Sequence, residues 1–314
     1  MPRIGTSDLN VHPLGLGGNT FGMTTDAAGS EKVLDAFVDR GGNHIDTADM
    51  YSFWVPGNSG GESEKIIGDW MRKRGNRDSV IVASKVSGLP DLQGLAPATI
   101  AKGVNASLQR LQTDYIDLYY AHYEDENTPI IESAAAFDEL VKLGKIRYVG
   151  LSNLSPQSIT EWIRVAKENG LALPVALQPN YSLVNRRDYE QGIANLAESQ
   201  QLGVFTYSSL ASGFLTGKYR TQEDLEGAAR GPAVEPLLNN DGLRVIDELA
   251  SIASRHDASI ATVALAWLLA KPTVTGPLAS ATSLSQLDDL MAAPNMELSD
   301  EEVKTLDEAS AAFA

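Results

Sequence analysis

Residues 42–51 of the chain read GNHIDTADMY, a short apolar run that ends in a cluster of polar side chains. Two later segments have the same form, SVIVASK over 79–85 and YIDLYYAH over 115–122. Each is rich in aliphatic residues, as expected of a parallel strand that is covered on both faces, and each stops at a side chain capable of acid–base chemistry. The pattern predicts a parallel sheet whose strands bring their ends together at one edge.

Working outward from these segments, further apolar runs bring the number of predicted strands to eight. They cover residues 14–18, 43–47, 79–85, 115–122, 146–151, 175–178, 203–207 and 274–278. Eight parallel strands alternating with helices are the number that closes a barrel. We therefore expect an α/β protein with the (α/β)8 TIM barrel fold, and one domain over residues 1–314.

Amphipathic segments between the strands predict the helices. They cover residues 31–40, 63–74, 97–111, 130–143, 155–168, 188–200, 241–255 and 283–292. Ser155 followed by Pro156, and Ser299 followed by two acidic residues, are typical helix starts. Two additional helices, over 259–270 and 299–311, do not fit the alternation and are predicted to be peripheral. Residues 3–11 predict an N-terminal β-hairpin that turns at Ser7 and Asp8 and plugs the bottom of the barrel.

Composition limits the possible partners. The 25 Lys and Arg residues are outnumbered by 41 Asp and Glu residues, giving a formal net charge of −16, which disfavours binding to nucleic acid or to an anionic membrane. The chain has no cysteine, so disulfides and thiolate catalysis are excluded. Its start does not resemble a signal peptide, and no apolar run approaches the roughly 20 residues that span a bilayer. We expect a soluble, cytoplasmic protein of undetermined oligomeric state.

Asp46, Tyr51, Lys85 and His122 follow three consecutive predicted strands, and together they suit the reduction of a carbonyl group. That reaction needs a hydride at carbon and a proton at oxygen. Tyr51 is the predicted acid; a nearby Lys85 ammonium is expected to lower its pKa, and Asp46 to hold the lysine in place. His122 is expected to orient the substrate. Each residue alone has a structural interpretation, such as a loop cap, a packed ring, a buried ion pair or a rim residue, but the set favours catalysis.

Four motifs, taken together, point to a known family. They are GNHIDTADMY over 42–51, GESEKIIG over 61–68, ASKV over 83–86 and LQTDYIDL over 111–118, the last leading into His122. In this order the chain resembles the aldo-keto reductases over almost its entire length. The resemblance implies an NAD(P)H-dependent oxidoreductase that reduces aldehydes or ketones reversibly, with Tyr51 as general acid and base and a small carbonyl compound as substrate.

The resemblance also implies an extended nicotinamide cofactor across the barrel mouth, without a Gly-x-Gly-x-x-Gly turn. The residues that it assigns to cofactor binding are Gly18, Asn19 and Thr20 near the nicotinamide ribose, Ser152, Asn153 and Gln178 near the carboxamide, Tyr207 beneath the ring, Ser208, Leu210, Ser212, Gly213, Lys218 and Arg230 in a loop over the pyrophosphate, and Ser280, Thr282 and Gln286 at the adenosine end; Asp46 is assigned to it as well.

Two departures from the family pattern concern specificity. Residues 52–60 form a longer loop than usual, and its Phe53 and Trp54 are either substrate-pocket walls or rim aromatics packed on the barrel. The other predicted pocket residues are Phe21, Met23, Tyr123 and Asn185. At the adenosine end, residues 280–283 lack the cation that commonly pairs with a 2′-phosphate. NADP(H) is the first choice from the resemblance, with Lys218 or Arg230 as alternative cations, and NAD(H) is the rival.

Three other functions remain open from the sequence. A Schiff-base aldolase could use Lys85 as its nucleophile, although pairing with Asp46 would keep the amine protonated. A cofactor-binding sensor or regulatory subunit would keep the fold without turnover. Metal catalysis is the weakest option, because the four histidines are scattered without ligand spacing.

Overall fold

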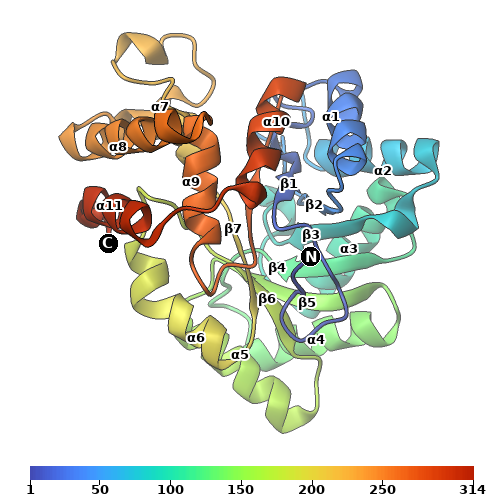
Figure 1. Ribbon diagram of the computed structural model, residues 1–314. Helices are drawn as coiled ribbons and strands as arrows, with labels where there is room; N and C mark the ends of the chain where they lie inside the picture. The colour runs from blue at the N-terminus through green and yellow to red at the C-terminus, as the bar shows by residue number, and fades with distance from the viewer.

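All eight predicted strands are present, and they close into a parallel barrel in which each strand pairs with its sequence neighbours and β8 pairs with β1 (Figure 1). The computed structural model describes residues 1–314. The strands are β1 Gly15–Gly17, β2 His44–Asp46, β3 Ile81–Val86, β4 Ile116–Ala121, β5 Ile146–Ser152, β6 Pro174–Gln178, β7 Gly203–Thr206 and β8 Gly276–Ala279. The fold is therefore the (α/β)8 barrel that the strand pattern predicts.

Helices surround the barrel, and several begin where their capping residues predict. They are α1 Ala27–Asp39, α2 Glu62–Arg74, α3 Pro97–Leu111, α4 Ile130–Lys142, α5 Pro156–Asn169, α6 Ala194–Ser199, α7 Gly231–Val234, α8 Asn240–His256, α9 Ile260–Leu269, α10 Leu284–Ala292 and α11 Asp300–Ala309. Ser155 caps α5, and Ser299 forms a capping box with Glu302 at the start of α11. Helix α1 begins four residues before the predicted start, because Asp26 accepts a hydrogen bond from the Gly29 N–H. No helix is both long enough and apolar enough to cross a membrane.

The two helices before β8 have the opposite roles to those predicted. Helix α9, predicted to be peripheral, packs directly against β8 and α10, and every residue from Ala261 to Leu268 is buried. Helix α8, predicted to cover the barrel, packs on α9 and α11 instead, and Figure 1 shows α8 and α11 beside each other away from the strands. The reason is composition. The α9 sequence IATVALAWLL is apolar on every face, so the whole helix is most stable when buried, whereas α8 has a polar face that can lie in solvent.

A third difference from the predicted helices lies after β6. The segment predicted as one helix over 188–200 begins with a π-helical stretch, Tyr189–Ile193, and only then continues as the short helix α6. Such wide turns locally disturb the regular hydrogen-bond ladder of an α-helix.

The N-terminal hairpin closes the floor of the barrel, the end formed by the amino ends of the strands. It is held by a single antiparallel bridge between Arg3 and Asn10, rather than by two full strands. Its apolar side chains Ile4, Leu9 and Val11 are buried in one cluster with inward-facing side chains of β3, β4, β6, β7 and β8. A second, larger cluster fills the space between the strands and the surrounding helices. The predicted plug is thus present.

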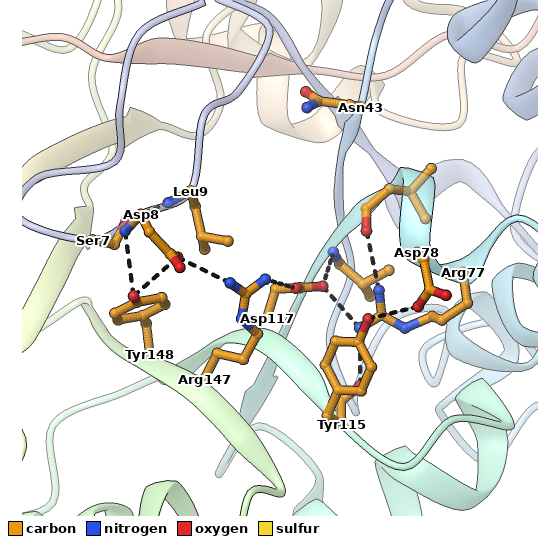
Figure 2. A network of polar contacts seen from close by, with 12 residues as sticks. Ser7, Asp8, Leu9, Asn43, Arg77, Asp78, Tyr115, Asp117, Arg147 and Tyr148 are labelled. Atoms are coloured by element: carbon orange, nitrogen blue, oxygen red, sulfur yellow. Dashed lines mark hydrogen bonds and ion pairs between the residues drawn. The ribbon is translucent and has the colours of Figure 1, made fainter.

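A polar network fastens this hairpin to the strands (Figure 2). Asp117 of β4 accepts hydrogen bonds from Arg77 Nη2 at 2.8 Å and from the Val82 N–H at 2.9 Å through one oxygen, and from Arg147 Nη1 at 3.0 Å through the other. Arg147 also donates to Asp8 Oδ1 at 2.9 Å. Every oxygen of the buried Asp117 carboxylate is therefore matched, and the network links the hairpin to three consecutive strands.

Candidate active site

Three neighbouring strands bring the four predicted catalytic side chains to the mouth of the barrel, the end opposite the floor. Asp46 is the last residue of β2, Lys85 lies near the end of β3, and His122 directly follows β4. The register pairs Asp46 with Ala83, so Lys85 lies two residues further toward the mouth. Tyr51 reaches the same point from the loop after β2.

The Lys85 ammonium is the centre of the cluster. Its Nζ donates to Asp46 Oδ2 at 2.7 Å, to the Thr47 backbone oxygen at 2.7 Å and to Tyr51 Oη at 3.0 Å. Asp46 Oδ1 accepts a further bond from Gln178 Nε2 at 2.8 Å. Since Tyr51 Oη accepts a hydrogen bond from Lys85, its own hydrogen is free to be donated. The distance from Tyr51 Oη to Asp46 Oδ2 is 3.3 Å, which is long for an O–H···O bond, so a ligand can compete with Asp46 for this hydrogen.

Burial decides the protonation states of this cluster. Burial and the negative charge of Asp46 hold the pKa of Tyr51 well above its usual value. The sequence predicts that Lys85 lowers this pKa, but burial and Asp46 act in the opposite direction, and the pKa is raised overall. Burial also lowers the pKa of Lys85, and Asp46 opposes that shift. At neutral pH Tyr51 keeps its proton.

His122 is a neutral imidazole. Burial and the nearby Lys85 ammonium hold its pKa well below the usual value. Its Nδ1 is buried and makes no hydrogen bond. Its ring stacks on Tyr123 with 4.4 Å between centroids, and its backbone oxygen accepts from Asn153 Nδ2 at 2.9 Å. The ring is thus fixed in place with its hydrogen-bonding capacity unused.

A cavity of about 780 Å³ opens above Tyr51 and His122 and extends along the loops after β7 and β8. It collects most of the residues assigned to the cofactor: Asn19, Thr20, Asn153, Gln178, Tyr207, Ser208, Leu210, Ser212, Gly213, Lys218, Arg230, Ser280, Thr282 and Gln286. Three residues assigned to the cofactor do not line it. Asp46 is buried in contact with Lys85 and Tyr51, Ser152 is buried and donates to the Gln178 oxygen, and Gly18 packs against Ser63.

The part of the cavity nearest Tyr51 suits a nicotinamide ring and its carboxamide. Side-chain amides of Asn153 and Gln178 and the ring of Tyr207 line it. The Tyr207 hydroxyl donates to Asn153 Oδ1 at 2.6 Å, and Gln178 Nε2 donates to Asp46 Oδ1 at 2.8 Å. Amides provide both donors and acceptors, as a carboxamide requires.

The middle of the cavity suits a diphosphate. Ser208, Ala211, Ser212 and Gly213 all have positive φ, from 46° to 93°. This tight turn brings Ser208, Ser209 and Ser212 to the cavity wall, where their hydroxyl groups can donate to an anion. Lys218 and the half-buried Arg230 line the same region. In a chain of net charge −16, these two cations are what an anionic ligand requires.

The far end of the cavity is formed by the loop after β8 and the start of α10. Gln286 Oε1 accepts hydrogen bonds from the Thr282 N–H at 2.9 Å and from its hydroxyl at 3.0 Å, and the Ser280 hydroxyl donates to Asn19 Oδ1 at 2.6 Å. The acidic Asp289 lies at this end and escaped the sequence analysis. Residues 280–283 contribute no cation to this end of the cavity.

The substrate end contains Met23, Trp54 and Tyr123, all three of them predicted pocket residues. One other prediction is wrong, because Phe21 is fully buried in the core. Asn185 lines an adjoining cavity of about 560 Å³, which shares Asn153, Gln178 and Tyr207 with the mouth cavity. The sequence analysis missed Met50, whose position next to Tyr51 in the chain was the available signal.

No group of three or more His, Asp or Glu side chains is placed to hold a metal ion.

Comparisons with known proteins agree with this geometry. The family model described as "Aldo/keto reductase family" matches residues 13–311. The chain is similar to a probable voltage-gated potassium channel subunit beta of Oryza sativa subsp. japonica, at 34% identity over 93% of this chain and 90% of the relative. It is also similar to the uncharacterized oxidoreductase YrpG of Bacillus subtilis, at 32% identity over 97% and 94%. A third relative is norsolorinic acid reductase of Aspergillus flavus, at 30% identity over 97% and 79%.

Proposed function

Because the chain belongs to the aldo/keto reductase family, we propose that it reduces aldehydes or ketones reversibly with a nicotinamide cofactor, and that Tyr51 is the general acid. One observation carries the proposal: Tyr51 Oη receives a hydrogen bond from the buried Lys85 and faces a cavity lined with amides and two cations. When bound, a reduced nicotinamide supplies the hydride to the carbonyl carbon.

The protein's own residues handle the proton. Tyr51 is protonated at neutral pH and gives its proton to the carbonyl oxygen as that oxygen becomes an alkoxide. The Lys85 ammonium, 3.0 Å away, stabilises the phenolate that remains, and Asp46 keeps the ammonium in position. The neutral His122 donates a hydrogen bond to the substrate oxygen from the cavity side. In the reverse direction the Tyr51 phenolate takes up the alcohol proton.

We also propose that NADP(H) is preferred to NAD(H), with Lys218 or Arg230, the two cations that line the cavity, supplying the charge that residues 280–283 lack. Fluorescence titration of the protein with NADPH and with NADH tests this directly, and we expect tighter binding of NADPH. The variant Arg230→Gln should lose about tenfold in NADPH affinity, which corresponds to one weakened charge pair. Arg220→Gln, which removes an exposed cation paired with Asp247, is the matched control.

The titration separates the possible outcomes. A loss confined to NADPH supports Arg230 at the 2′-phosphate, and an equal loss for both cofactors supports Arg230 at the diphosphate instead. Failure of either cofactor to bind would remove the reductase function while leaving the barrel unaffected.

A regulatory role is the second candidate, because one relative is named as a subunit of a potassium channel. It predicts a protein that binds cofactor but turns over none of a broad panel of aldehydes and ketones. All four catalytic residues are in contact here, which favours turnover.

The aldolase alternative is weaker. Lys85 Nζ donates three hydrogen bonds, to Asp46, to the Thr47 oxygen and to Tyr51, which uses all three hydrogens of an ammonium. Asp46 also opposes the lowering of the Lys85 pKa by burial. A borohydride-trapped adduct at Lys85 would restore this alternative.

A further inference from the structure

The adjoining cavity of about 560 Å³ has no part in the proposed reduction, and we call it the side cavity. It lies between the start of α5 and residues 185–193, which connect β6 to α6. Its volume is typical of small-molecule sites in proteins, which measure roughly 300–1,000 Å³. It shares only Asn153, Gln178 and Tyr207 with the mouth cavity, so a ligand in its remaining part does not overlap the residues assigned to the cofactor.

One wall of the side cavity is held in place by contacts with the rest of the protein. The buried Arg186 donates to the Asp307 backbone oxygen and to Ser310 Oγ, both at 2.8 Å, at the end of α11. The Tyr189 ring packs on the Tyr181 ring with 4.3 Å between centroids. These contacts fix the segment before any ligand arrives, which lowers the entropy cost of binding.

The same wall contains the π-helical stretch Tyr189–Ile193. Four of its five residues line the side cavity, namely Tyr189, Gln191, Gly192 and Ile193. Turns of this kind are rare and frequently occur at functional sites. The departure from α-helical geometry therefore coincides with the cavity.

A buried acceptor in the side cavity has no donor. Asn180 Oδ1 is shielded from solvent and accepts no hydrogen bond. The backbone around it is fixed, because Asn180 forms a β-bridge with Tyr207, whose N–H donates to the Pro179 oxygen at 3.0 Å. A buried polar atom without a partner is costly. A ligand that donates an N–H or O–H to this oxygen would remove that cost.

The other lining residues favour a flat ligand with a polar edge. Leu151, Leu154 and Ile159 contribute apolar surface, against which the hydroxyls of a sugar would stay unpaired. Asn185 and Gln191 contribute side-chain amides, which combine donors and an acceptor in one plane. A planar heterocycle matches both kinds of surface, since its faces are apolar and its edge carries the hydrogen-bonding groups.

Charge does not favour an ion in the side cavity. Its charged lining residues are Arg187 and Asp188, which are both exposed and have opposite signs. We propose that the side cavity is a second binding site, separate from the reductase site, for an uncharged purine that carries an exocyclic amino group and donates from it to Asn180 Oδ1. Side-chain amides are known to read the edge of such a base through one donor and one acceptor.

The first test compares adenosine with inosine by calorimetry on protein saturated with NADP⁺, or with NAD⁺ if only that cofactor binds. The two nucleosides differ at the group that faces Asn180, an amino group in adenosine and a carbonyl oxygen in inosine. We expect adenosine to bind roughly tenfold more tightly, the effect of leaving one buried acceptor unpaired. Failure of adenosine to bind, or equal affinity for inosine, would overturn the proposal. Binding that the cofactor abolishes would place adenosine in the mouth cavity and overturn it as well.

Two substitutions locate the site. Asn180→Leu keeps the size of the side chain and removes the acceptor, so the affinity for adenosine should fall to that for inosine. Gly192→Leu removes no polar group; a Cβ at Gly192 points toward Pro156 Cγ at 3.1 Å, so the added side chain narrows the cavity and should abolish binding. It supplies the test if Asn180→Leu does not fold. Asn195→Leu, at an exposed residue of α6 outside both cavities, is the matched control. Unchanged adenosine binding in the two cavity variants would contradict the assignment.

These measurements need no turnover, so the inference and the proposed function can fail separately. A protein that reduces no aldehyde but binds adenosine, and loses that binding in Gly192→Leu, retains the side cavity as a site and loses only the reductase function. An active reductase whose cofactor complex does not bind adenosine retains its reductase function and loses only the second site.

Discussion

The floor and the mouth of the barrel both bury carboxyl groups, but they provide them with different partners. On the floor, Asp117 receives two guanidinium groups and a backbone N–H, as Figure 2 shows. At the mouth, Asp49 lies between Asp46 and Tyr51 in the sequence. Its side chain is fully buried, and neither of its oxygens makes a hydrogen bond of normal geometry. Burial and the nearby Glu64 raise its pKa to about 7.

The difference corresponds to the two tasks of such a barrel. Matched polar groups on the floor fix the hairpin and the strands, which is where stability is usually found in this fold. The mouth instead holds groups with displaced pKa values, namely Asp49, Tyr51 and His122. Groups of this kind cluster where protons are transferred. Substitutions on the floor should therefore change stability, and substitutions at the mouth should change chemistry or pH dependence.

The largest effect is expected for Tyr51→Phe. It removes the acid and keeps the ring, so kcat should fall by at least roughly 10²–10⁴-fold while cofactor affinity and unfolding midpoint stay close to those of the wild type. Steady-state kinetics and a denaturant titration measure both. A variant with nearly normal kcat would show that Tyr51 has only a structural role, and would contradict the assignment of chemistry to the mouth and stability to the floor.

Asp117→Asn should have the largest effect on stability. It leaves Arg77 and Arg147 facing a neutral amide, and breaking a largely buried charge network costs about 3 kcal/mol. We expect this loss in the free energy of unfolding measured in urea, with kcat changed little at temperatures where the variant is folded. A large fall in kcat without a loss of stability would show that the floor network serves the mouth.

Asp49→Asn should change how stability depends on pH. The folded Asp49 keeps its proton up to about pH 7, whereas an unfolded aspartate releases it above about pH 4. Folding therefore binds a proton in this window, and Asp49 makes the wild type progressively less stable as pH rises from about 4 to 7. The variant cannot ionise, so its free energy of unfolding should increase relative to the wild type by about 3 kcal/mol between pH 5 and 8.

The control for that comparison lies inside the barrel. Burial lowers the pKa of His44 to about 4, so His44 has the opposite effect and makes the protein more stable as pH rises from about 4 to 6.5. This contribution is the same in both proteins and cancels in the difference. Parallel stability curves for wild type and Asp49→Asn would show that Asp49 ionises normally.

The smallest effect is expected for Asp8→Asn. Its side chain is 69% exposed, although it belongs to the same network as Asp117. Exposed ion pairs contribute at most about 1 kcal/mol, so the free energy of unfolding should change by less than that, and less still at high salt. A loss as large as that of Asp117→Asn would mean that the hairpin depends on its charge rather than on its buried apolar side chains.

Local patterns were sufficient to predict the barrel and the proximity of its four candidate catalytic residues. Apolar runs of the right length predict strands, and the polar residues that follow them must meet because parallel strands end at one edge of a closed sheet. Asp46, Lys85 and His122 therefore could be assigned from their positions in the chain. The positions of Ser155 and Ser299 predicted helix starts for the same reason: a cap acts on the next three residues.

Only the tertiary structure decided the features that depend on contacts between residues far apart in the sequence. Which of α8 and α9 covers the barrel follows from the packing of α9 against β8 and α10. The raised pKa of Tyr51 follows from its burial and from its distance to Asp46. The cavity at the mouth combines residues from the loops after β1, β2, β4, β7 and β8. Burial and long-range proximity are properties of the folded chain, so no local pattern of residues specifies them.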